Sequence, residues 1–321
     1  MIDELAVKEI LKELSSTDYA CFSSEAQLRD SFAIYLAKKY PNCIVYPEYT
    51  QPIPNGWRCS EKKHVHFDLL VEDKETNETI LFEFKYKTTK SEFNLAKFNM
   101  YLCDNSDSTN GRYAIWRDIY RVETFANLNK ITKGFIVFVT NNSSYCCEPK
   151  RGYAAEFSLA KGLHKAGSRS WTIPAGMSIS TINSIEKTYR NDKYPLITEN
   201  DYFFNYDDYS IINDVTGKKH IFTQLVIPVH SKAYNEKLND ILSSIGKKNF
   251  VEYYRLFEKQ DGAYCKKQLL SDGFTKNSTD TIVNASKRLF EKQQNVEALR
   301  NVIASSKVDE SLRKQAIDLF K

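Results

Sequence analysis

The sequence predicts an α/β protein, with a mixed central sheet flanked by helices and an all-helical C-terminal region. Apolar, β-branched and aromatic residues fill 65–71 and again 80–86, on either side of a polar turn, which is typical of two paired strands. A fully apolar run at 134–140 follows a segment with helical periodicity at 112–128, and this order is typical of the α/β class. From about residue 233 onward the patterns are helical.

Composition sets the broad class. The chain has 321 residues, 42% of them hydrophobic and 27% charged, as expected for a soluble globular protein of one large or two smaller domains. No run of about 18 apolar residues occurs, so we expect no membrane-spanning helix, and the first residues lack the apolar core of a signal peptide. Seven scattered cysteines without a C-x-x-C pair predict reduced thiols and a cytoplasmic location. A net charge of +4 permits nucleic-acid binding without arguing for it.

The chain begins with two predicted helices. The first spans 3–14, and the second starts at Ser23 or Ser24, both good N-caps, and ends before Pro41. Glu25 lies in the first turn, where a carboxylate is favourable without any further role. A short strand follows at 43–46, and Glu48 at its end is either part of a metal site or simply exposed.

The two paired strands carry the candidate chemistry. Because side chains alternate along a strand, His66 and Asp68 are expected to share one face, and Glu83 and Lys85 another. Two carboxylates and an ammonium group then converge, which is costly in a buried place unless the charges are paired or bind a metal. Mg²⁺ prefers carboxylate oxygens together with phosphate and water, so Asp68 and Glu83 suit it. Lys85 would then position or help to deprotonate a water, or neutralise phosphate charge.

Glu-x-Lys alone is common, and an ordinary amphipathic hairpin is the alternative. With its context, however, Asp68 followed fifteen positions later by Glu83-Phe84-Lys85 in an apolar strand resembles the PD-(D/E)XK nuclease superfamily; Phe67 stands where a proline often does. The resemblance covers about 20–142 and implies a restriction-endonuclease-like core of helix, three-strand meander, helix and strand. GRYAIWRDIYRVETF and KGFIVFVTNN also resemble an uncharacterised bacterial branch, from which no substrate is carried over.

The resemblance implies a DNA endonuclease that depends on Mg²⁺ or Mn²⁺ and leaves a 5′-phosphate. It makes Asp68, Glu83, Lys85 and Glu25 the catalytic candidates, because many members place a glutamate on a helix before the sheet. The metal candidates are Asp68, Glu83, Glu25 and Glu48. Basic residues near the expected mouth of the site are candidates for DNA contact: Lys87, Lys90, Arg58, Arg117 and Arg121. Arg117, Asp118 and Arg121 are otherwise expected to form a surface ion-pair network on their helix.

The second half of the chain is less specific. Residues 150–193 are basic and 194–216 are acidic and aromatic, and strands around 202–209 and 222–229 are expected to extend the sheet. We expect a nuclease-like domain at 1–232 and a helical domain at 233–321, with helices at 235–245, 249–260, 263–271, 278–294, 295–305 and 309–320. Residues 262–293 have the length of a helix-turn-helix, a weak signal. Dimerisation is favoured over DNA engagement, because acids match the basic residues nearby.

These observations favour a restriction or antiviral DNA endonuclease that acts on double-stranded DNA as a homodimer, since two sites must face antiparallel strands. A methyltransferase or another system partner encoded nearby would fit that function. Two alternatives stay open: a nuclease subunit of a DNA-processing or transposition complex, and a non-catalytic nucleic-acid-binding protein on the same fold.

Overall fold

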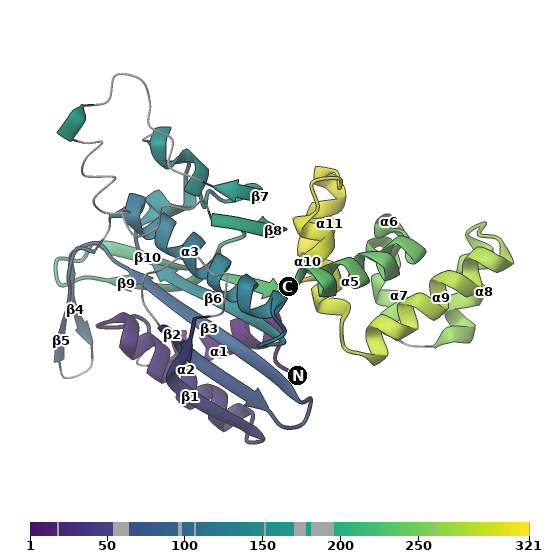
Figure 1. Cartoon of the computed structure of the whole chain (residues 1–321), viewed down its shortest axis with the longest axis horizontal. Helices are drawn as coiled ribbons and strands as arrows, with labels where there is room; N and C mark the ends of the chain where they lie inside the picture. The colour runs from purple at the N-terminus through teal and green to yellow at the C-terminus, as the bar shows by residue number, and fades with distance from the viewer. Residues whose placement is uncertain are drawn as a thin grey trace.

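The structure is a computed structural model, and it describes residues 1–17, 19–53, 64–95, 98–105, 107–150, 152–169, 178–180, 196–259 and 261–320. A six-stranded mixed sheet forms its centre, in the order β1-β2-β3-β6-β10-β9 (Figure 1). The strands are β1 (Cys43–Pro52), β2 (His64–Asp73), β3 (Glu78–Lys87), β6 (Lys133–Thr140), β10 (Lys219–His230) and β9 (Asp207–Asn213). The predicted α/β class is confirmed.

The predicted succession of helix, three strands, helix and strand is present. Helix α2 (Glu25–Lys39) precedes the antiparallel meander β1-β2-β3, and α3 (Ser108–Asn127) connects β3 to the parallel strand β6. Helix α2 starts where predicted, because the Ser24 side chain accepts a hydrogen bond from the Gln27 amide. Strand β1 extends well beyond the predicted 43–46.

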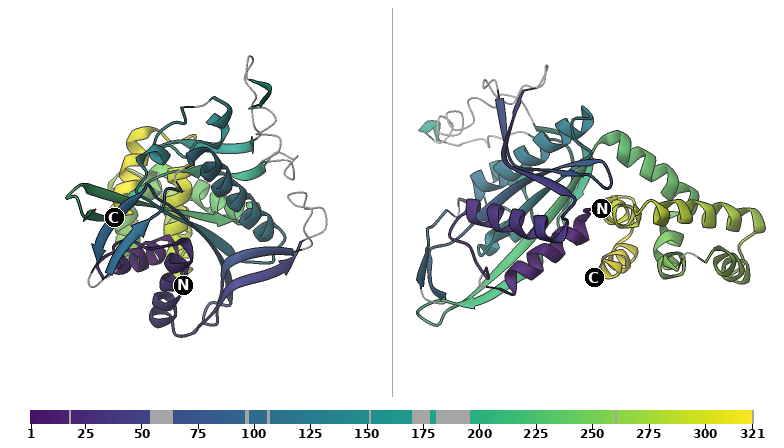
Figure 2. Two further views of the ribbon diagram at one scale, coloured as in Figure 1. Left: turned by 90° about the vertical axis from the view of Figure 1, so that its left-hand side faces the viewer. Right: turned by 90° about the horizontal axis from the view of Figure 1, so that it is seen from below.

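The sheet is the middle of three layers. Helices α1 (Glu4–Ser15) and α2 cover one face, and α3 covers the other (Figure 2). Alternation along β3 serves both layers: Phe82 and Phe84 pack in the core beneath α1 and α2, and Leu81 packs in the core beneath α3. Every residue of β6 is buried, as its unbroken apolar run predicted.

Two two-stranded sheets lie outside the main sheet. The polar segment after β3 contains β4 (Ser91–Leu95) and β5 (Phe98–Leu102). It is anchored because Phe93 is buried against the ring of His220, at 5.2 Å between centroids. Strand β8 (Leu196–Phe203) pairs with β7 (His164–Arg169) in a separate sheet. The strand expected around 202–209 is thus divided between β8 and β9, and only β9 joins β10 in the main sheet. Two 3-10 turns follow β6, at Ser143–Cys146 and Gly152–Phe157.

Helices make up the rest of the chain: α5 (Lys232–Ile245), α6 (Lys247–Glu252), α7 (Tyr254–Glu258), α8 (Gly262–Ser271), α9 (Lys276–Glu291), α10 (Asn295–Ala304) and α11 (Glu310–Leu319). The predicted helix at 249–260 is split into α6 and α7. These helices share a third core, which Phe203 of β8 joins. Helix α10 also contacts the rest of the molecule, because Arg300 donates a 3.0 Å hydrogen bond to the carbonyl of Phe203 and lies 3.4 Å from the Glu4 carboxylate.

Within the described ranges, none of the helices combines the length and the apolar character needed to cross a membrane. The described cysteines are all free.

Candidate active site

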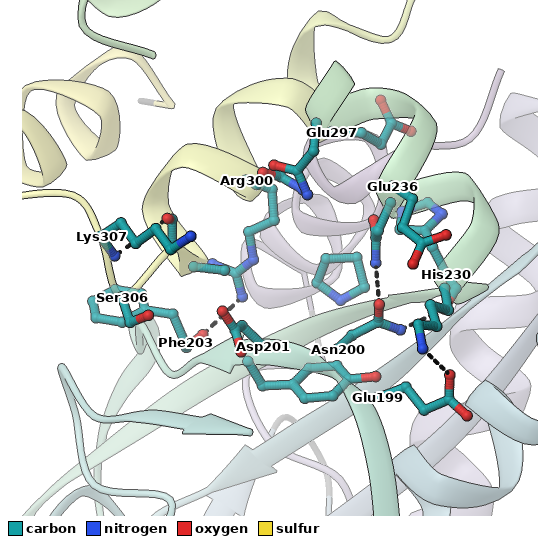
Figure 3. A pocket seen from close by; sticks show the side chains of 18 of the residues that line it. Glu199, Asn200, Asp201, Phe203, His230, Glu236, Glu297, Arg300, Ser306 and Lys307 are labelled. Carbon is teal, nitrogen blue, oxygen red and sulfur yellow. Dashed lines mark hydrogen bonds and ion pairs between the residues drawn. The ribbon is translucent and has the colours of Figure 1, made fainter. Parts of the chain in front are cut away.

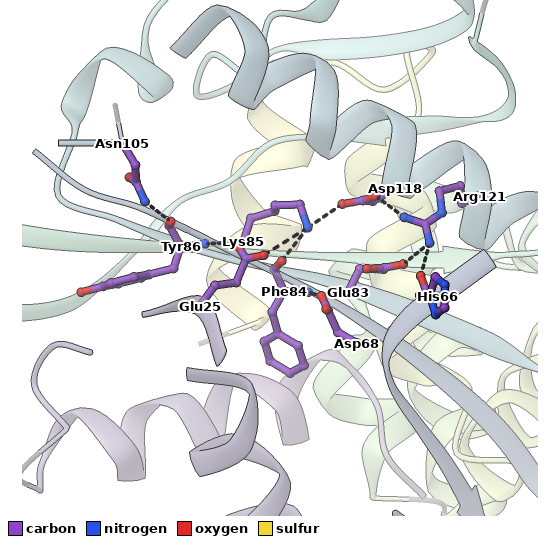
Figure 4. A network of polar contacts seen from close by, with 10 residues as sticks. All are labelled: Glu25, His66, Asp68, Glu83, Phe84, Lys85, Tyr86, Asn105, Asp118 and Arg121. Carbon is purple, nitrogen blue, oxygen red and sulfur yellow. Dashed lines mark hydrogen bonds and ion pairs between the residues drawn. The ribbon is translucent and has the colours of Figure 1, made fainter. Parts of the chain in front are cut away.

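The predicted catalytic residues meet where β2 and β3 separate. The pairing of these strands ends at Leu69 and Phe82, whereas β3 stays paired with β6 as far as Lys87. Carboxylates then replace the missing strand: the Phe84 amide donates to Asp68 Oδ2 at 2.7 Å, and the Tyr86 amide donates to Glu25 Oε2 at 2.9 Å (Figure 4). The two carboxylates therefore satisfy backbone amides on the free edge of β3. The same contacts bring Asp68 and Glu25 close to Glu83 and Lys85.

Strict alternation does not hold along β2. Phe67 packs in the core beneath α3, whereas Leu69, two positions later, packs in the core on the opposite face. The irregularity lies at Asp68, whose side chain turns to the edge of β3. The His66 ring instead interacts with Thr50 Oγ1 on β1 at 2.8 Å.

Lys85 projects from β3 toward α3. Its Nζ lies 2.9 Å from Asp118 Oδ2 and 3.6 Å from Glu25 Oε1, and it donates to the Phe84 carbonyl at 2.7 Å. Burial alone would lower the pKa of Lys85, but the charges of Asp118, Glu25 and Glu83 outweigh it and raise that pKa. The surrounding carboxylates therefore favour the charged form of Lys85.

Arg121 of α3 completes the network. It lies 2.9 Å from Asp118 Oδ1 and 3.3 Å from Glu83 Oε1, and it donates to the His66 carbonyl. Asp118 is fully buried between the two cations. Burial favours the neutral acid, but Lys85 and Arg121 prevail and hold the pKa of Asp118 below its usual value.

Glu83 is the buried carboxyl of the cluster whose pKa is raised. Its side chain is 2% exposed, and its Oε1 has no hydrogen-bond partner within the described part of the chain. Burial, together with repulsion from Asp118, raises the pKa of Glu83 well above its usual value, despite Arg121 and Lys85. The cluster holds four carboxylates against the cations of Lys85 and Arg121, so it has room for further positive charge.

The four predicted metal ligands do not form one site. Among the residues that the structure describes, no group of three or more His, Cys, Asp or Glu side chains is arranged to hold a metal. Glu48 points away: its side chain is 74% exposed and pairs with Arg29 at 2.8 Å. Glu25 is committed to the Tyr86 amide and Lys85.

Of the predicted metal ligands, Asp68 and Glu83 remain as candidates for a hard divalent cation. Mg²⁺ is usually bound through one or two carboxylates, with waters and phosphate completing its shell. The buried Oε1 of Glu83, which lacks a hydrogen bond, is a suitable oxygen ligand. Carboxylate oxygens are the donor type that Mg²⁺ or Mn²⁺ takes.

The candidate DNA contacts have different surroundings. Lys87 at the end of β3 is half-buried, and Lys90 beyond it is exposed. Arg117 is half-buried on α3, one turn before Arg121. Arg121 is engaged by the carboxylates described above, and Arg58 lies outside the described residues.

The prediction for Asp118 is wrong. A surface ion-pair network is expected from the sequence, but Asp118 is buried and holds both cations. The sequence carries a signal for this, because Asp118 lies three positions after Ile115 and four before Val122, both in the apolar stripe of α3. A charged residue within such a stripe is expected to find a buried partner.

A separate pocket of about 490 Å³ lies where α5, α10 and β8 meet (Figure 3). None of the predicted site residues lines it. Its wall includes His230 and Glu297, both more than nine-tenths buried. Burial lowers the pKa of His230 to about 3 and raises that of Glu297 to about 7.

Comparison with known proteins adds no relative to this geometry. A scan against protein-family models finds no match for the chain, and a search of curated proteins finds none either.

Proposed function

We propose that the chain is a metal-dependent endonuclease that hydrolyses phosphodiester bonds of double-stranded DNA, in restriction or antiviral defence. The observation that supports this most directly is the meeting of Asp68, Glu83 and Lys85 at the separation of β2 and β3, with Glu25 reaching the same place. The succession of α2, the β1-β2-β3 meander, α3 and β6 supports a restriction-endonuclease-like core.

The residues have distinct roles in this proposal. Asp68 and Glu83 would hold Mg²⁺ or Mn²⁺, which when bound supplies Lewis-acid polarisation of the phosphate and an activated water. Lys85, kept protonated by its carboxylate partners, stabilises the negative charge that develops on the phosphate. Asp118 and Glu25 fix the position of the Lys85 ammonium group. Lys87 and Lys90 extend positive charge along the substrate path.

The direct test is cleavage of supercoiled plasmid by the full chain with Mg²⁺, with Mn²⁺ and with EDTA. The proposal requires nicked or linear product with either metal and none with EDTA. End-labelling of the product should detect a 5′-phosphate. Absence of product with both metals, on DNA that the protein binds, contradicts it.

One observation favours a second function, a non-catalytic nucleic-acid-binding protein. The Glu83 oxygen that suits a metal lies 3.3 Å from Arg121, which already supplies a positive charge. In that case, binding of duplex DNA would be independent of Mg²⁺ and no cleavage would be seen. We also propose that the chain acts as a homodimer. A methyltransferase or a transposition complex as partner can be tested by adding those proteins to the same cleavage assay.

A further inference from the structure

Helices α8 and α9 form a helix-turn-helix. Four residues, 272–275, separate Ser271 at the end of α8 from Lys276 at the start of α9. Gly273 has φ +91°, which favours glycine at this turn. The Thr275 side chain caps α9 by accepting a 3.3 Å hydrogen bond from the Ser278 amide.

Helix α9 has one buried and one open face. Ile282, Val283, Leu289 and Phe290 belong to the core that α9 shares with the neighbouring helices. The other face presents Asn277, Thr281, Asn284 and Arg288, all exposed. Their spacing of four, three and four positions places them in one stripe along the helix. No residue that the structure describes covers this stripe.

The chemistry of the stripe suits the edges of DNA bases. The stripe contains no acidic residue. Asp280 and Glu291 of the same helix lie outside it, and they are paired with Lys266 at 2.6 Å and with Lys287 at 3.5 Å. Asparagine can bind adenine through two hydrogen bonds, arginine can bind guanine in the same way, and threonine can contact either an amide edge or a thymine methyl.

Exposed lysines lie on both helices. Lys276 starts α9, and Lys267 lies on α8, the helix that would cross the DNA backbone. Both are suited to phosphate contacts, which position a protein on a duplex. The balance of acidic and basic residues, which favoured dimerisation in the sequence, thus arises from local pairs such as Lys266–Asp280 and Lys287–Glu291. These pairs leave the stripe exposed.

We propose that α8 and α9 bind double-stranded DNA with the Asn277–Thr281–Asn284–Arg288 face of α9 in the major groove. The role of this contact, to direct the substrate to the active site, rests on the proposed nuclease function. The binding itself can be measured without cleavage.

The test uses the full chain in EDTA and a fluorescent duplex of mixed sequence, about three helical turns long. Arg288→Glu is expected to weaken binding about tenfold or more and to flatten its salt dependence. Asn284→Ala is expected to change the sequence enriched from a pool of random duplexes. Lys314→Glu is the matched control, because Lys314 is an exposed lysine on α11 and its loss should leave affinity unchanged.

Unchanged affinity and sequence preference in Arg288→Glu and Asn284→Ala would overturn the proposal. So would an Arg288→Glu protein that changes only its sedimentation, which would make the face a contact between copies of the chain. Thermal unfolding checks that each variant is folded. Failure of the nuclease proposal is separate: the wild type would not cut, yet its duplex binding would still depend on Arg288.

Discussion

The charge of Lys85 is set by its neighbours. Asp118 and Glu25 hold its ammonium group on the α3 side of β3, and the raised pKa keeps it protonated throughout the neutral range. The function of Lys85 in the proposed reaction is therefore electrostatic. A neutral side chain of similar length at position 85 should abolish that function.

Asp68→Asn, Glu83→Gln and Lys85→Met are each expected to lower the rate of plasmid cleavage at least 100-fold, on the order of 3 kcal/mol. The first two remove a carboxylate oxygen that would hold the metal, and the third removes the positive charge that stabilises the transition state. Glu25→Ala should reduce the cleavage rate less, because the Glu25 side chain is 39% exposed and its 3.6 Å ion pair with Lys85 is long. Glu72→Gln, on the same strand as Asp68, is the matched control. Near wild-type rates in either of the first two variants exclude the assignment.

Asp118→Asn is expected to destabilise the fold. It leaves Lys85 and Arg121 without their shared buried carboxylate, and removal of one partner from a buried ion pair costs about 3–5 kcal/mol. Urea unfolding followed by circular dichroism measures the change. Asp280→Asn, which removes an exposed partner of Lys266, should change stability little. Equal effects of the two substitutions would mean that the Asp118 network contributes no special stability.

Glu297 predicts a pH dependence of stability. Its pKa is about 7 in the folded chain, against an ordinary 4.5, because of burial that Lys133 only partly offsets. Below the ordinary value the side chain is protonated in both states and burial has no ionisation cost. As pH rises toward 7 the unfolded chain ionises first, so stability falls, by up to about 3 kcal/mol. Asp3 and Glu78 face the same group and add to the repulsion.

Glu297→Gln should remove this fall. Urea unfolding of both proteins between pH 5 and 8 tests it: the wild type should lose stability relative to the variant as pH rises. A constant difference between the two curves would show that Glu297 does not titrate in this range.

At the scale of elements, the contact between α3 and β6 positions Asp118 and Arg121 over β3. This contact requires a glycine at position 134, where a Cβ atom would lie 2.3 Å from Val122 Cγ1 and 2.8 Å from the Leu81 carbonyl. The close approach of α3 to the sheet therefore depends on the absence of a side chain in β6.

Gly134→Ala is expected to lower the free energy of unfolding by about 1–3 kcal/mol, because the added methyl must displace α3 or β3. Cleavage should fall as well, since α3 carries Asp118. Gly262→Ala is the control: its Cβ would meet only Val283, at 3.7 Å, and it lies at the start of α8. Thermal unfolding of both variants gives the comparison. Equal melting temperatures would show that the sheet accommodates the methyl group.

At the scale of the molecule, α10 connects the C-terminal helices to the sheet. Arg300 contacts Glu4 of α1, Glu297 lies 3.8 Å from Lys133 of β6, and Phe203 of β8 enters the helical core. Residues 233–321 can be separated as an independent helical domain, as predicted, only if the rest of the chain stays folded without these contacts.

A chain that ends at His230 is expected to melt several degrees below the full chain, because Phe203 becomes exposed and Glu4 loses Arg300. Calorimetry and light scattering of both proteins test this. A truncated chain that melts like the full one, runs as a monomer and nicks plasmid instead of cutting both strands would support the sequence-based prediction of a separable dimerisation domain.

The sequence alone determined the features that depend on local pattern. The hairpin of β2 and β3, the start of α2 at Ser24 and the apolar strand β6 follow from alternation, capping and burial within short segments. For the same reason, the order Asp68, Glu83, Lys85 is recognisable in the linear chain. Energies that favour these elements act between near neighbours in the chain.

Only the tertiary structure decided which charges meet. The separation of β2 and β3 beyond the Leu69–Phe82 pair turns Asp68 to the edge of β3. The packing of α3 brings Asp118 and Arg121 to Lys85, and Glu48 pairs with Arg29 instead. These contacts join segments far apart in the sequence, and they depend on the twist of the sheet and the close approach of its layers. A buried charge is tolerated only where that packing supplies a partner, so its position is settled by the whole fold.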